Sequence, residues 1–295
     1  MILSTVIVTY NHENDIKTCL TSLGDHLSIR PAEIIVVDNH SQDRTIAAVE
    51  DKRFRLKAKS LQLRILRNST NTGFTHASNQ GLRMAGGKFV LLLNPDTQIT
   101  PQSIEKMIHF LSNNPNAGAV APQLHYPDGS IQPSCRRFPQ YRYLLSEAFG
   151  LNRLFPKTKL FNGWRMGDFD HTATRDVDQP QGACLLLTKS IGEQIGWLDE
   201  RFVMFFSDVD FCRRIKQIGK KIYFYSKSTV VHRKGSSIYN RRTKMIRQSH
   251  QDFIRYFLKW YRSPTGWLCT FFGIPFLIIL GSVRWSYFRV KERIV

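Results

Sequence analysis

Acidic residues are scarce in this sequence. It holds 23 Asp and Glu against 42 Lys and Arg, so its formal net charge at pH 7 is +19. A charge of this size predicts an anionic partner, which is nucleic acid, a phospholipid surface or a phosphorylated substrate. Nucleic acid is the weakest of these, because no RNP, zinc-finger or helix-turn-helix pattern is present and the basic residues pool after residue 230.

Cysteine is also sparse and follows no pattern. No two cysteines form a C-x-x-C pair, and the five of them are Cys19, Cys135, Cys184, Cys212 and Cys269. This excludes a zinc or disulfide framework and predicts a reducing compartment. The N-terminus lacks the basic segment of a secretory signal and enters a strand pattern almost at once, so we expect the catalytic part in the cytosol.

Two common nucleotide-binding motifs are missing. No G-x-G-x-x-G follows the first apolar run, which counts against a dinucleotide oxidoreductase, and no G-x-x-x-x-G-K-[ST] occurs, which counts against a P-loop NTPase. The sequence instead alternates short apolar runs, at residues 4–11, 33–38, 61–66 and 89–93, with helical patterns. This alternation predicts an α/β fold built from βαβ units, with a mostly parallel sheet flanked by helices.

The strand predicted at residues 89–93 organises the rest of the chain. It ends abruptly in Asn94, Pro95 and Asp96. Because Pro95 cannot continue the ladder, Asp96 lies at the carboxyl end of a central strand, where open α/β sheets bind ligands. A hard divalent cation that bridges phosphate oxygens suits a carboxylate in this place. The alternative is an ordinary turn, in which Asp96 caps a helix that starts near Pro101.

Other predicted strands also end in polar side chains. Since the carboxyl ends of parallel strands share one edge of a sheet, we expect a crevice lined by Thr9, Tyr10, Asn11, Asp38, Asn39, Asp43 and Asp96. Asp38 would there accept hydrogen bonds from a nucleobase or ribose. The turn from Asn71 to Gly73 would let the backbone approach a diphosphate closely, because glycine carries no side chain.

The second half of the chain adds candidate catalytic groups. Gly182 and Ala183 precede an apolar strand, and their small size indicates close approach by something bulky. Asp208 follows aromatic residues at a helix start, a setting that suits a general base. Ser207 and Asp210 have the spacing of a capping box, which predicts a structural role for Asp210.

His232 ends another predicted strand and is followed by Arg233 and Lys234. This arrangement suits a metal ion or diphosphate oxygens, although a lone histidine is more commonly structural or solvated.

The C-terminal region combines basic and apolar segments. Residues 266–283 carry no charge, and basic residues flank them on both sides. Their length is at the low edge for a membrane span, for which roughly 18 residues is the usual minimum, and Pro275 would kink a helix. We therefore expect an interfacial or re-entrant segment on an anionic membrane rather than a clean span, with a buried core helix as the alternative.

Together these motifs resemble the family-2 glycosyltransferases, which have the GT-A fold. The resemblance covers about residues 1–240 and is carried, in this order, by residues 6–11, 37–41, 71–74, 94–96, 182–183, 206–210 and His232. It is nearest to bacterial rhamnosyltransferases that build O-antigen or cell-wall linkers on polyprenyl diphosphate carriers. It implies a Rossmann-like GT-A domain at residues 1–240, with a nucleotide-sugar-binding half at 1–115 and an acceptor and catalytic half at 116–240. Residues 241–295 would form a helical membrane-associating region.

The resemblance also implies roles for residues. The nucleotide would be bound by Thr9, Tyr10, Asn11, Asp38, Asn39, Asn71, Gly73 and Asn94. Asp96 and His232 would hold a divalent cation, Mg²⁺ or Mn²⁺, and Asp208 would be the catalytic base. The acceptor side would include Gly182, Ala183, Asp210, Arg233 and Lys234. Two positions depart from the family pattern, because Asn94 stands in the place of an acid and Ser207 in the place of a Glu.

The implied reaction is transfer of a sugar, L-rhamnose by the nearest resemblance. The donor would be linked to dTDP or UDP, and the acceptor would be a lipid-linked glycan at the cytoplasmic face of the plasma membrane. One base and one displacement invert the anomeric centre, and no nucleophile for a double displacement is evident. A different sugar from UDP, such as galactose, galactofuranose or GlcNAc, is an alternative. A nucleic-acid-binding protein and an inactive scaffold are alternatives of another class.

Overall fold

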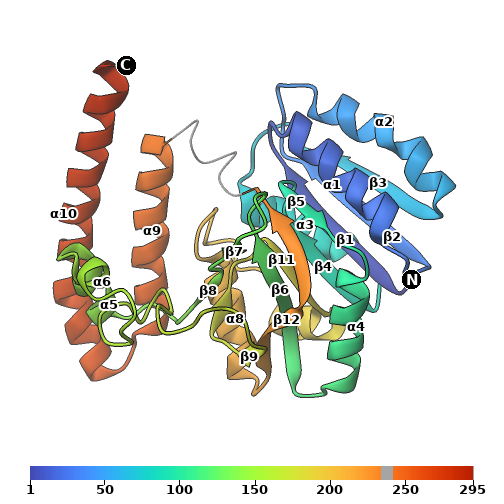
Figure 1. The fold of residues 1–295 in the computed structure, drawn as a ribbon. Coiled ribbons are helices and arrows are strands. Elements are labelled where there is room, and N and C mark those ends of the chain that lie inside the picture. The colour runs from blue at the N-terminus through green and yellow to red at the C-terminus, as the bar shows by residue number, and fades with distance from the viewer. Residues whose placement is uncertain (234–241, 295) are drawn as a thin grey trace.

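The computed structural model of this chain describes residues 1–233 and 242–294 (Figure 1). Parallel strands alternate with helices through its first third. The elements are β1 (Leu3–Thr9), α1 (Glu13–His26), β2 (Ala32–Asp38), α2 (Thr45–Ala58), β3 (Leu61–Arg67), α3 (Phe74–Met84) and β4 (Phe89–Leu93). β1 pairs in parallel with β2 and β4, and β2 pairs in parallel with β3. The predicted βαβ units are confirmed.

The second part of the chain extends the same sheet with mixed direction. Its elements are β5 (Thr97–Ile99), α4 (Ser103–Asn113), β6 (Ala117–His125), β7 (Ile131–Gln132), β8 (Cys135–Arg136), α5 (Tyr141–Ala148), α6 (Leu151–Leu154), β9 (Arg175–Asp176), β10 (Gln179–Pro180), β11 (Cys184–Thr188), α7 (Lys189–Ile195), α8 (Ser207–Gln217) and β12 (Lys221–His232). The strand order is β3-β2-β1-β4-β11-β6-β12-β5. β11 runs antiparallel to β4 and β6, while β12 runs parallel to β6.

Helices cover both faces of this sheet, which explains the unbroken apolar runs of its central strands. Every residue of β1, β2 and β4 is buried. One core cluster joins Leu3 and Ile7 of β1 to residues of α1, α2 and α4, and a second joins Val6 and Val8 to residues of α3, α7 and α8. β3 is only partly buried, in keeping with its place as the first strand in the sheet order.

The carboxyl ends of β1, β2 and β4 lie along one edge of the sheet, which runs across the strands. β12 also ends at this edge, and β11 begins there. The registers show this, since Thr9 pairs with Asp38, Leu93 with Cys184, and His232 with Thr97. The strand ends predicted to form one crevice therefore lie along one edge.

Two helices, α9 (Arg242–Trp260) and α10 (Pro264–Ile294), form the C-terminal part. They lie side by side, apart from the sheet, with α5 and α6 beside the lower part of α10 (Figure 1). A third apolar cluster joins Phe253 and Phe257 of α9 and Leu277 of α10 to Phe202 and Phe206. α10 continues through Pro275, and its segment Pro264–Val283 is long and apolar enough to cross a membrane, with 22% of it buried against the protein.

Candidate functional site

Asp96 and His232 form a buried pair at the shared sheet edge. The Asp96 Oδ1 and His232 Nε2 atoms are 3.4 Å apart, and their side chains are 9% and 2% exposed. Asp96 Oδ1 has no hydrogen-bond partner among the described residues. Asp96 is followed by β5, and α4 begins only at Ser103, so the alternative in which Asp96 caps that helix is wrong.

Gln132 fixes which nitrogen of His232 carries a proton. The Gln132 Nε2 atom donates to the His232 carbonyl at 3.3 Å, so its Oε1 atom, 2.7 Å from His232 Nδ1, must accept a proton from the ring. A neutral His232 therefore directs the lone pair of Nε2 toward Asp96. This is the arrangement in which a second residue orients a histidine for metal binding.

These residues fit a divalent cation. With the His232 ring neutral, Nε2 and the Asp96 carboxylate are both acceptors, and a cation held by Asp96 and His232 would relieve their repulsion. The described residues include no cluster of three or more His, Cys, Asp and Glu suited to a metal. Further ligands would therefore come from water or substrate oxygens, as is usual for Mg²⁺ at phosphate sites.

Asp38 ends β2, which β1 separates from β4, and is 4% exposed. Its carboxylate accepts hydrogen bonds from the Ser41 N–H at 3.1 Å and the Ser41 hydroxyl at 2.5 Å. Thr9 is fully buried, and its hydroxyl has no partner among the described residues. Tyr10 is half-buried, and Asn11 is exposed and binds the Gln42 N–H at 2.7 Å.

Asn39 holds the loop that follows β3. Its side-chain oxygen accepts from the Thr72 N–H at 3.0 Å, and its side-chain nitrogen donates to Asn71 Oδ1 at 3.0 Å. Gly73 has a φ of +87°, and a Cβ there would meet Val203 Cγ1 at 2.7 Å. The glycine is thus needed for the turn and for Val203, which fills the space beside it.

Asp208 is the second residue of α8. Its Oδ2 atom accepts from Gln179 Nε2 at 3.0 Å and from the Gly182 N–H at 3.3 Å, and its Oδ1 atom accepts from the Val209 N–H at 2.9 Å. Burial raises the pKa of the Asp208 carboxyl, although these three donors act in the opposite direction. A carboxylate with a raised pKa is suited to accept a proton.

Gly182 and Ala183, which directly precede β11, connect Asp208 to the residue that follows β4. A Cβ on Gly182 would lie 3.2 Å from Asp208 Cβ, so the bulky neighbour expected beside this glycine is Asp208 itself. Ala183 is fully buried, and its carbonyl accepts the Asn94 N–H at 2.8 Å. Asp208, the candidate base, is therefore linked by hydrogen bonds through Gly182 and Ala183 to Asn94. Asn94 lies two residues before Asp96, the candidate cation ligand.

Comparisons with known proteins show the family and the fold of this chain. Residues 4–169, more than half of the 295, match the family model described as glycosyl transferase family 2. The chain belongs to this family. An N-acetylglucosaminyl-diphospho-decaprenol L-rhamnosyltransferase of Mycobacterium tuberculosis is 28% identical over 90% of this chain and 88% of its own length. A low-salt glycan biosynthesis hexosyltransferase of Haloferax volcanii is 25% identical over 73% of this chain and 62% of its own length.

Solved structures share the fold of this family-2 glycosyltransferase. A mannosyltransferase from Pyrobaculum calidifontis, in complex with GDP-Man and Mn²⁺, superposes with a TM-score of 0.60 at 18% identity over 95% of this chain and 73% of that one. S. aureus TarS superposes with a TM-score of 0.56 at 18% identity over 84% of this chain and 65% of that one. The predicted GT-A fold is confirmed.

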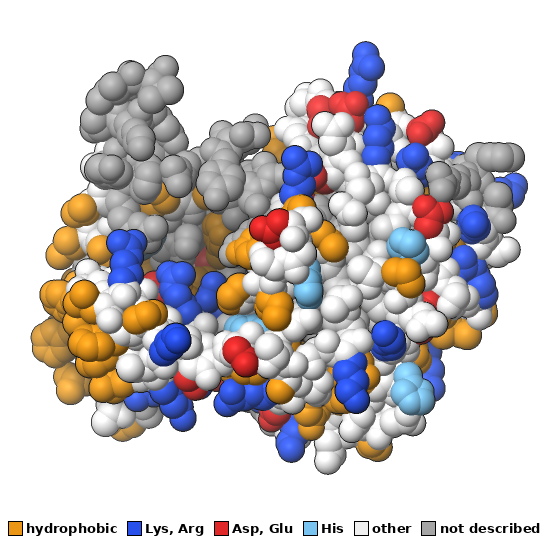
Figure 2. All heavy atoms as spheres, in the orientation of Figure 1, with side chains coloured by type: hydrophobic (Ala, Val, Ile, Leu, Met, Phe, Trp, Pro, Cys, Tyr) orange, Lys and Arg blue, Asp and Glu red, His pale blue; other side chains and the backbone are white. Residues whose placement is uncertain are grey.

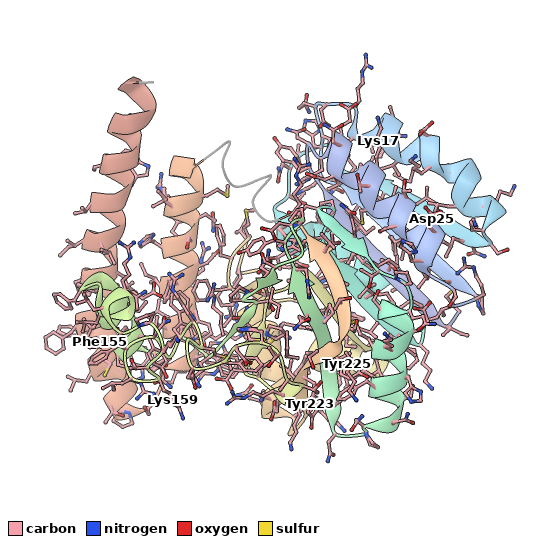
Figure 3. All side chains as sticks on the ribbon, viewed as in Figure 1. Lys17, Asp25, Phe155, Lys159, Tyr223 and Tyr225 are labelled. Atoms are coloured by element: carbon pink, nitrogen blue, oxygen red, sulfur yellow. The ribbon has the colours of Figure 1, made fainter. Side chains whose placement is uncertain are left out.

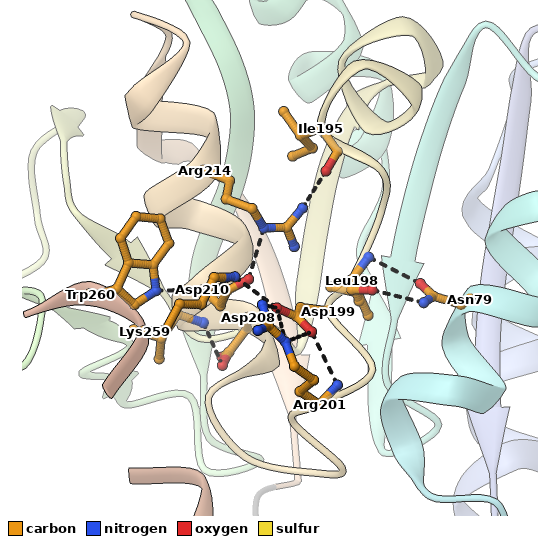
Figure 4. A network of polar contacts seen from close by, with 11 residues as sticks. Asn79, Ile195, Leu198, Asp199, Arg201, Asp208, Asp210, Arg214, Lys259 and Trp260 are labelled. Atoms are coloured by element: carbon orange, nitrogen blue, oxygen red, sulfur yellow. Dashed lines mark hydrogen bonds and ion pairs between the residues drawn. The ribbon is translucent and has the colours of Figure 1, made fainter. Parts of the chain in front are cut away.

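Asp210, for which the sequence predicts a structural role, is the centre of a buried polar network in this glycosyltransferase (Figure 4). Its carboxylate is fully buried and accepts from Arg214 Nε at 2.8 Å, Trp260 Nε1 at 2.9 Å and Lys259 Nζ at 2.5 Å. The predicted capping box is wrong, because Phe206 holds the cap position and forms no side-chain cap hydrogen bond. Asp210 lies in the first turn of α8, and its carboxylate binds Arg214 of α8 and Lys259 and Trp260 of α9.

Asp199 extends this network. Lys259 Nζ also donates to Asp199 Oδ2 at 2.8 Å. Although burial acts in the opposite direction, hydrogen bonds from Arg201 and Lys259 hold the pKa of the Asp199 carboxyl well below its usual range. The network therefore joins α8 to α9 through paired charges.

Arg233 donates its N–H to the Asp96 carbonyl at 2.9 Å, and its exposed side chain lies 3.8 Å from Asp15 Oδ1. Arg233 thus lies beside the candidate cation ligand, and its expected place on the acceptor side stays a prediction. Lys234 lies outside the described residues.

The sequence gives no signal for three residues that shape the site. Gln132 and Gln179 contact His232 and Asp208 across long stretches of chain. Arg136 pairs in register with Gln179, and burial lowers the pKa of its guanidinium while Asp208 acts in the opposite direction. The Arg136 guanidinium lies over the Trp164 ring, 5.9 Å from its centroid.

Proposed function

We propose that this glycosyltransferase moves L-rhamnose from a dTDP- or UDP-linked donor to a hydroxyl group of a polyprenyl-diphosphate-linked glycan, with inversion. The rhamnosyltransferase relative supports the sugar and the acceptor class, because its name specifies an L-rhamnosyl group and an N-acetylglucosaminyl-diphospho-decaprenol. The positive charge of the chain also favours substrates that carry diphosphates.

The observation that carries the proposal is the connection from Asp208 through Gly182 and Ala183 to Asn94, next to Asp96. Sugar transfer needs a group that stabilises the departing diphosphate and a base for the acceptor hydroxyl. Asp96 and His232 would hold the divalent cation, which supplies the first when bound. Asp208 would take the proton of the acceptor hydroxyl, which supplies the second.

The remaining residues would bind and orient the donor and acceptor. Asp38 would accept hydrogen bonds from the pyrimidine or ribose, with Thr9, Tyr10 and Asn11 beside it. Asn39, Asn71 and Gly73 would hold the loop that borders the nucleotide. Residues 1–115 would thus form the donor half, and residues 116–240 the acceptor half.

The enzyme would work at the cytoplasmic face of the plasma membrane, since its acceptor is lipid-linked and α10 offers an apolar attachment. The region from residue 241 to residue 295 would provide this attachment. The apolar segment Pro264–Val283 supports this assignment by its length and composition.

A thermal-shift panel of dTDP-rhamnose, UDP-sugars and GDP-mannose, with and without Mn²⁺ or Mg²⁺, tests the donor. We expect dTDP or UDP donors to raise the melting temperature most, and only with the cation. Stronger protection by GDP-mannose would refute the pyrimidine donor. Transfer to a synthetic N-acetylglucosaminyl-diphospho-polyprenol then tests the acceptor, and product without inversion would refute the single displacement.

A further inference from the structure

The helix α10 has two different faces. One face carries small residues and packs on the protein. Thr270 is buried, accepts a hydrogen bond from the Tyr141 hydroxyl at 3.0 Å and donates to the Gly266 carbonyl. A Cβ on Gly273 would collide with the Tyr141 ring, and one on Gly281 would lie 2.8 Å from His250 of α9. This face therefore fits closely against α5 and α9.

The other face of α10 is apolar and bare. Phe271 is 73% exposed and Phe272 is 67% exposed. The same face carries further exposed residues, which are Trp267, Leu268, Ile278, Ile279 and Val283. Soluble monomers rarely leave such an area of large apolar side chains in water.

The segment that contains α5 and α6 continues this apolar area. Phe149 and Leu154 are each 70% exposed, and Leu160 is 61% exposed. Figure 2 shows apolar side chains gathered on the side of the molecule that carries α10, α5 and α6. Phe155 and Lys159 lie on that side, away from the sheet (Figure 3).

The charges around these residues favour an anionic surface. Residues 141–160 contain four cations, Arg142, Arg153, Lys157 and Lys159, and one acid, Glu147. Glu147 is neutralised by Arg165, whose Nε lies 2.6 Å from its carboxylate. Apolar side chains interspersed with cations are typical of segments that lie in the headgroup region of anionic bilayers.

We propose that the bare face of α10 and the α5–α6 segment form one membrane-contact surface, and that the chain lies in one leaflet of an anionic bilayer without spanning it. This inference rests on the membrane attachment in the proposed function and deepens it. The partner is the phospholipid bilayer itself, because the surface is continuous with the apolar helix α10 and its α5–α6 segment carries four cations against one acid.

The packing of α9 is the reason that α10 does not span. α9 packs against α10 along the apolar segment, since His250 of α9 lies beside Gly281 and Tyr261, the residue that follows α9, lies beside Gly266. An upright α10 would carry α9 into the hydrocarbon with Asp252 and Arg255, whose ion pair has its arginine 43% exposed. Charged groups are costly there. A helix that lies flat instead keeps α9 on the protein side and buries only the bare face.

Sedimentation with vesicles of phosphatidylcholine, with and without phosphatidylglycerol, tests the surface. We expect the full chain to bind the anionic vesicles, and Phe149→Glu with Leu154→Glu to weaken binding at least about tenfold, since two large apolar side chains leave the interface. Ile2→Glu is the matched control, because Ile2 is 39% exposed at the far end of the molecule, and it should bind as the unaltered chain does. Equal binding by the double variant, or equal binding to uncharged vesicles, would overturn the proposal.

Probe depth separates lying flat from spanning. Cys269 is exposed while the other four cysteines are buried, so a fluorescent thiol probe labels it selectively. A second probe at Ile279→Cys, in a Cys269→Ser chain, lies about 15 Å further along the helix axis. We expect shallow lipid quenchers to act equally on both probes. Probes at clearly different depths would show a spanning helix and overturn the proposal.

Two further readouts keep this inference separate from the proposed function. Donor-induced thermal shifts without vesicles report on the glycosyltransferase site and should be the same in the double variant. Light scattering reports on self-association. If the chain dimerises through Phe149 and Leu154 and ignores vesicles, the surface belongs to a second copy and the membrane proposal is wrong.

Discussion

At the scale of single residues, two buried polar groups stand out: burial raises the pKa of Asp208, and a neighbouring side chain orients the ring of His232. Asp208 keeps a raised pKa although it accepts three hydrogen bonds. His232 is oriented by Gln132 so that Nε2 faces Asp96. A carboxyl with a raised pKa and a histidine oriented by a neighbouring side chain are both typical of functional sites.

Asp208 should reduce stability at neutral pH. Because burial raises the pKa of its carboxyl, the folded chain binds that proton more tightly than the unfolded chain does. The resulting stabilisation is complete below the unfolded pKa and is lost as the pH rises through the folded pKa. Asp208→Asn should therefore raise the melting temperature at neutral pH, with a smaller difference in acid. Melting curves from pH 4 to pH 8 measure this, and a lower melting temperature at neutral pH would contradict it.

Gln132 should govern cation affinity. Gln132→Leu removes the acceptor for the His232 Nδ1 proton, and loss of such an orienting residue typically weakens metal binding about 10–100-fold. Mn²⁺ titration followed by thermal shift measures the effect. Gln132→Glu keeps an acceptor and is the control, which should retain most of the affinity. Equal Mn²⁺ binding by Gln132→Leu would show that His232 is no ligand.

At the scale of elements, the ends of strands and the start of a helix bring the site together. Glycine at position 182 allows β11 to begin against α8, with Asp208 in the space that a side chain would take. The network around Asp210 then joins α8 to α9 (Figure 4). Catalytic geometry and helix packing thus depend on two carboxylates two residues apart.

Gly182→Ala should impair turnover more than donor binding. The new Cβ would lie 3.2 Å from Asp208 Cβ and 3.4 Å from its Oδ2 atom, so the carboxylate must shift by a few tenths of an ångström. Rates depend steeply on such placement. We expect a lower kcat with an unchanged donor Kd, measured by steady-state kinetics and donor-induced thermal shift. An unchanged kcat would show that Asp208 tolerates the shift or is no base.

Asp210→Asn should destabilise the fold. It leaves Lys259 without one of its buried partners, and removing one member of a buried ion pair typically costs about 3–5 kcal/mol. The free energy of unfolding from urea titration measures the loss. A loss of about 1 kcal/mol, the size expected for a helix cap, would contradict the buried network. Asp208→Asn, two residues away, is the matched control.

The sequence alone predicts the strands and the shared edge of the sheet, because buried strands and their polar ends are local patterns. It also predicts Asp96, Asp208 and His232 as candidates from those ends. It misses Gln132, which contacts a residue 100 positions away, and the partners of Asp210 in α9, 49 and 50 positions away. Such contacts depend on how distant segments pack, and no local pattern encodes them. The capping box failed for the same reason.

At the scale of the whole molecule, the chain combines a GT-A fold with a C-terminal pair of helices, α9 and α10. The sheet edge holds the candidate donor and base residues, and α9 packs both on this part of the chain and on the buried face of α10, which leaves the apolar face of α10 exposed. A lipid-linked acceptor at the bilayer surface would then meet a site that lies on the same chain.

The most direct test of this account is the turnover of Asp208→Asn with its best nucleotide-sugar donor, measured together with donor affinity. The account predicts a rate about 10²–10⁴-fold below that of the unaltered enzyme, the usual effect of losing a general base, with donor affinity retained. Turnover near the unaltered rate would contradict it.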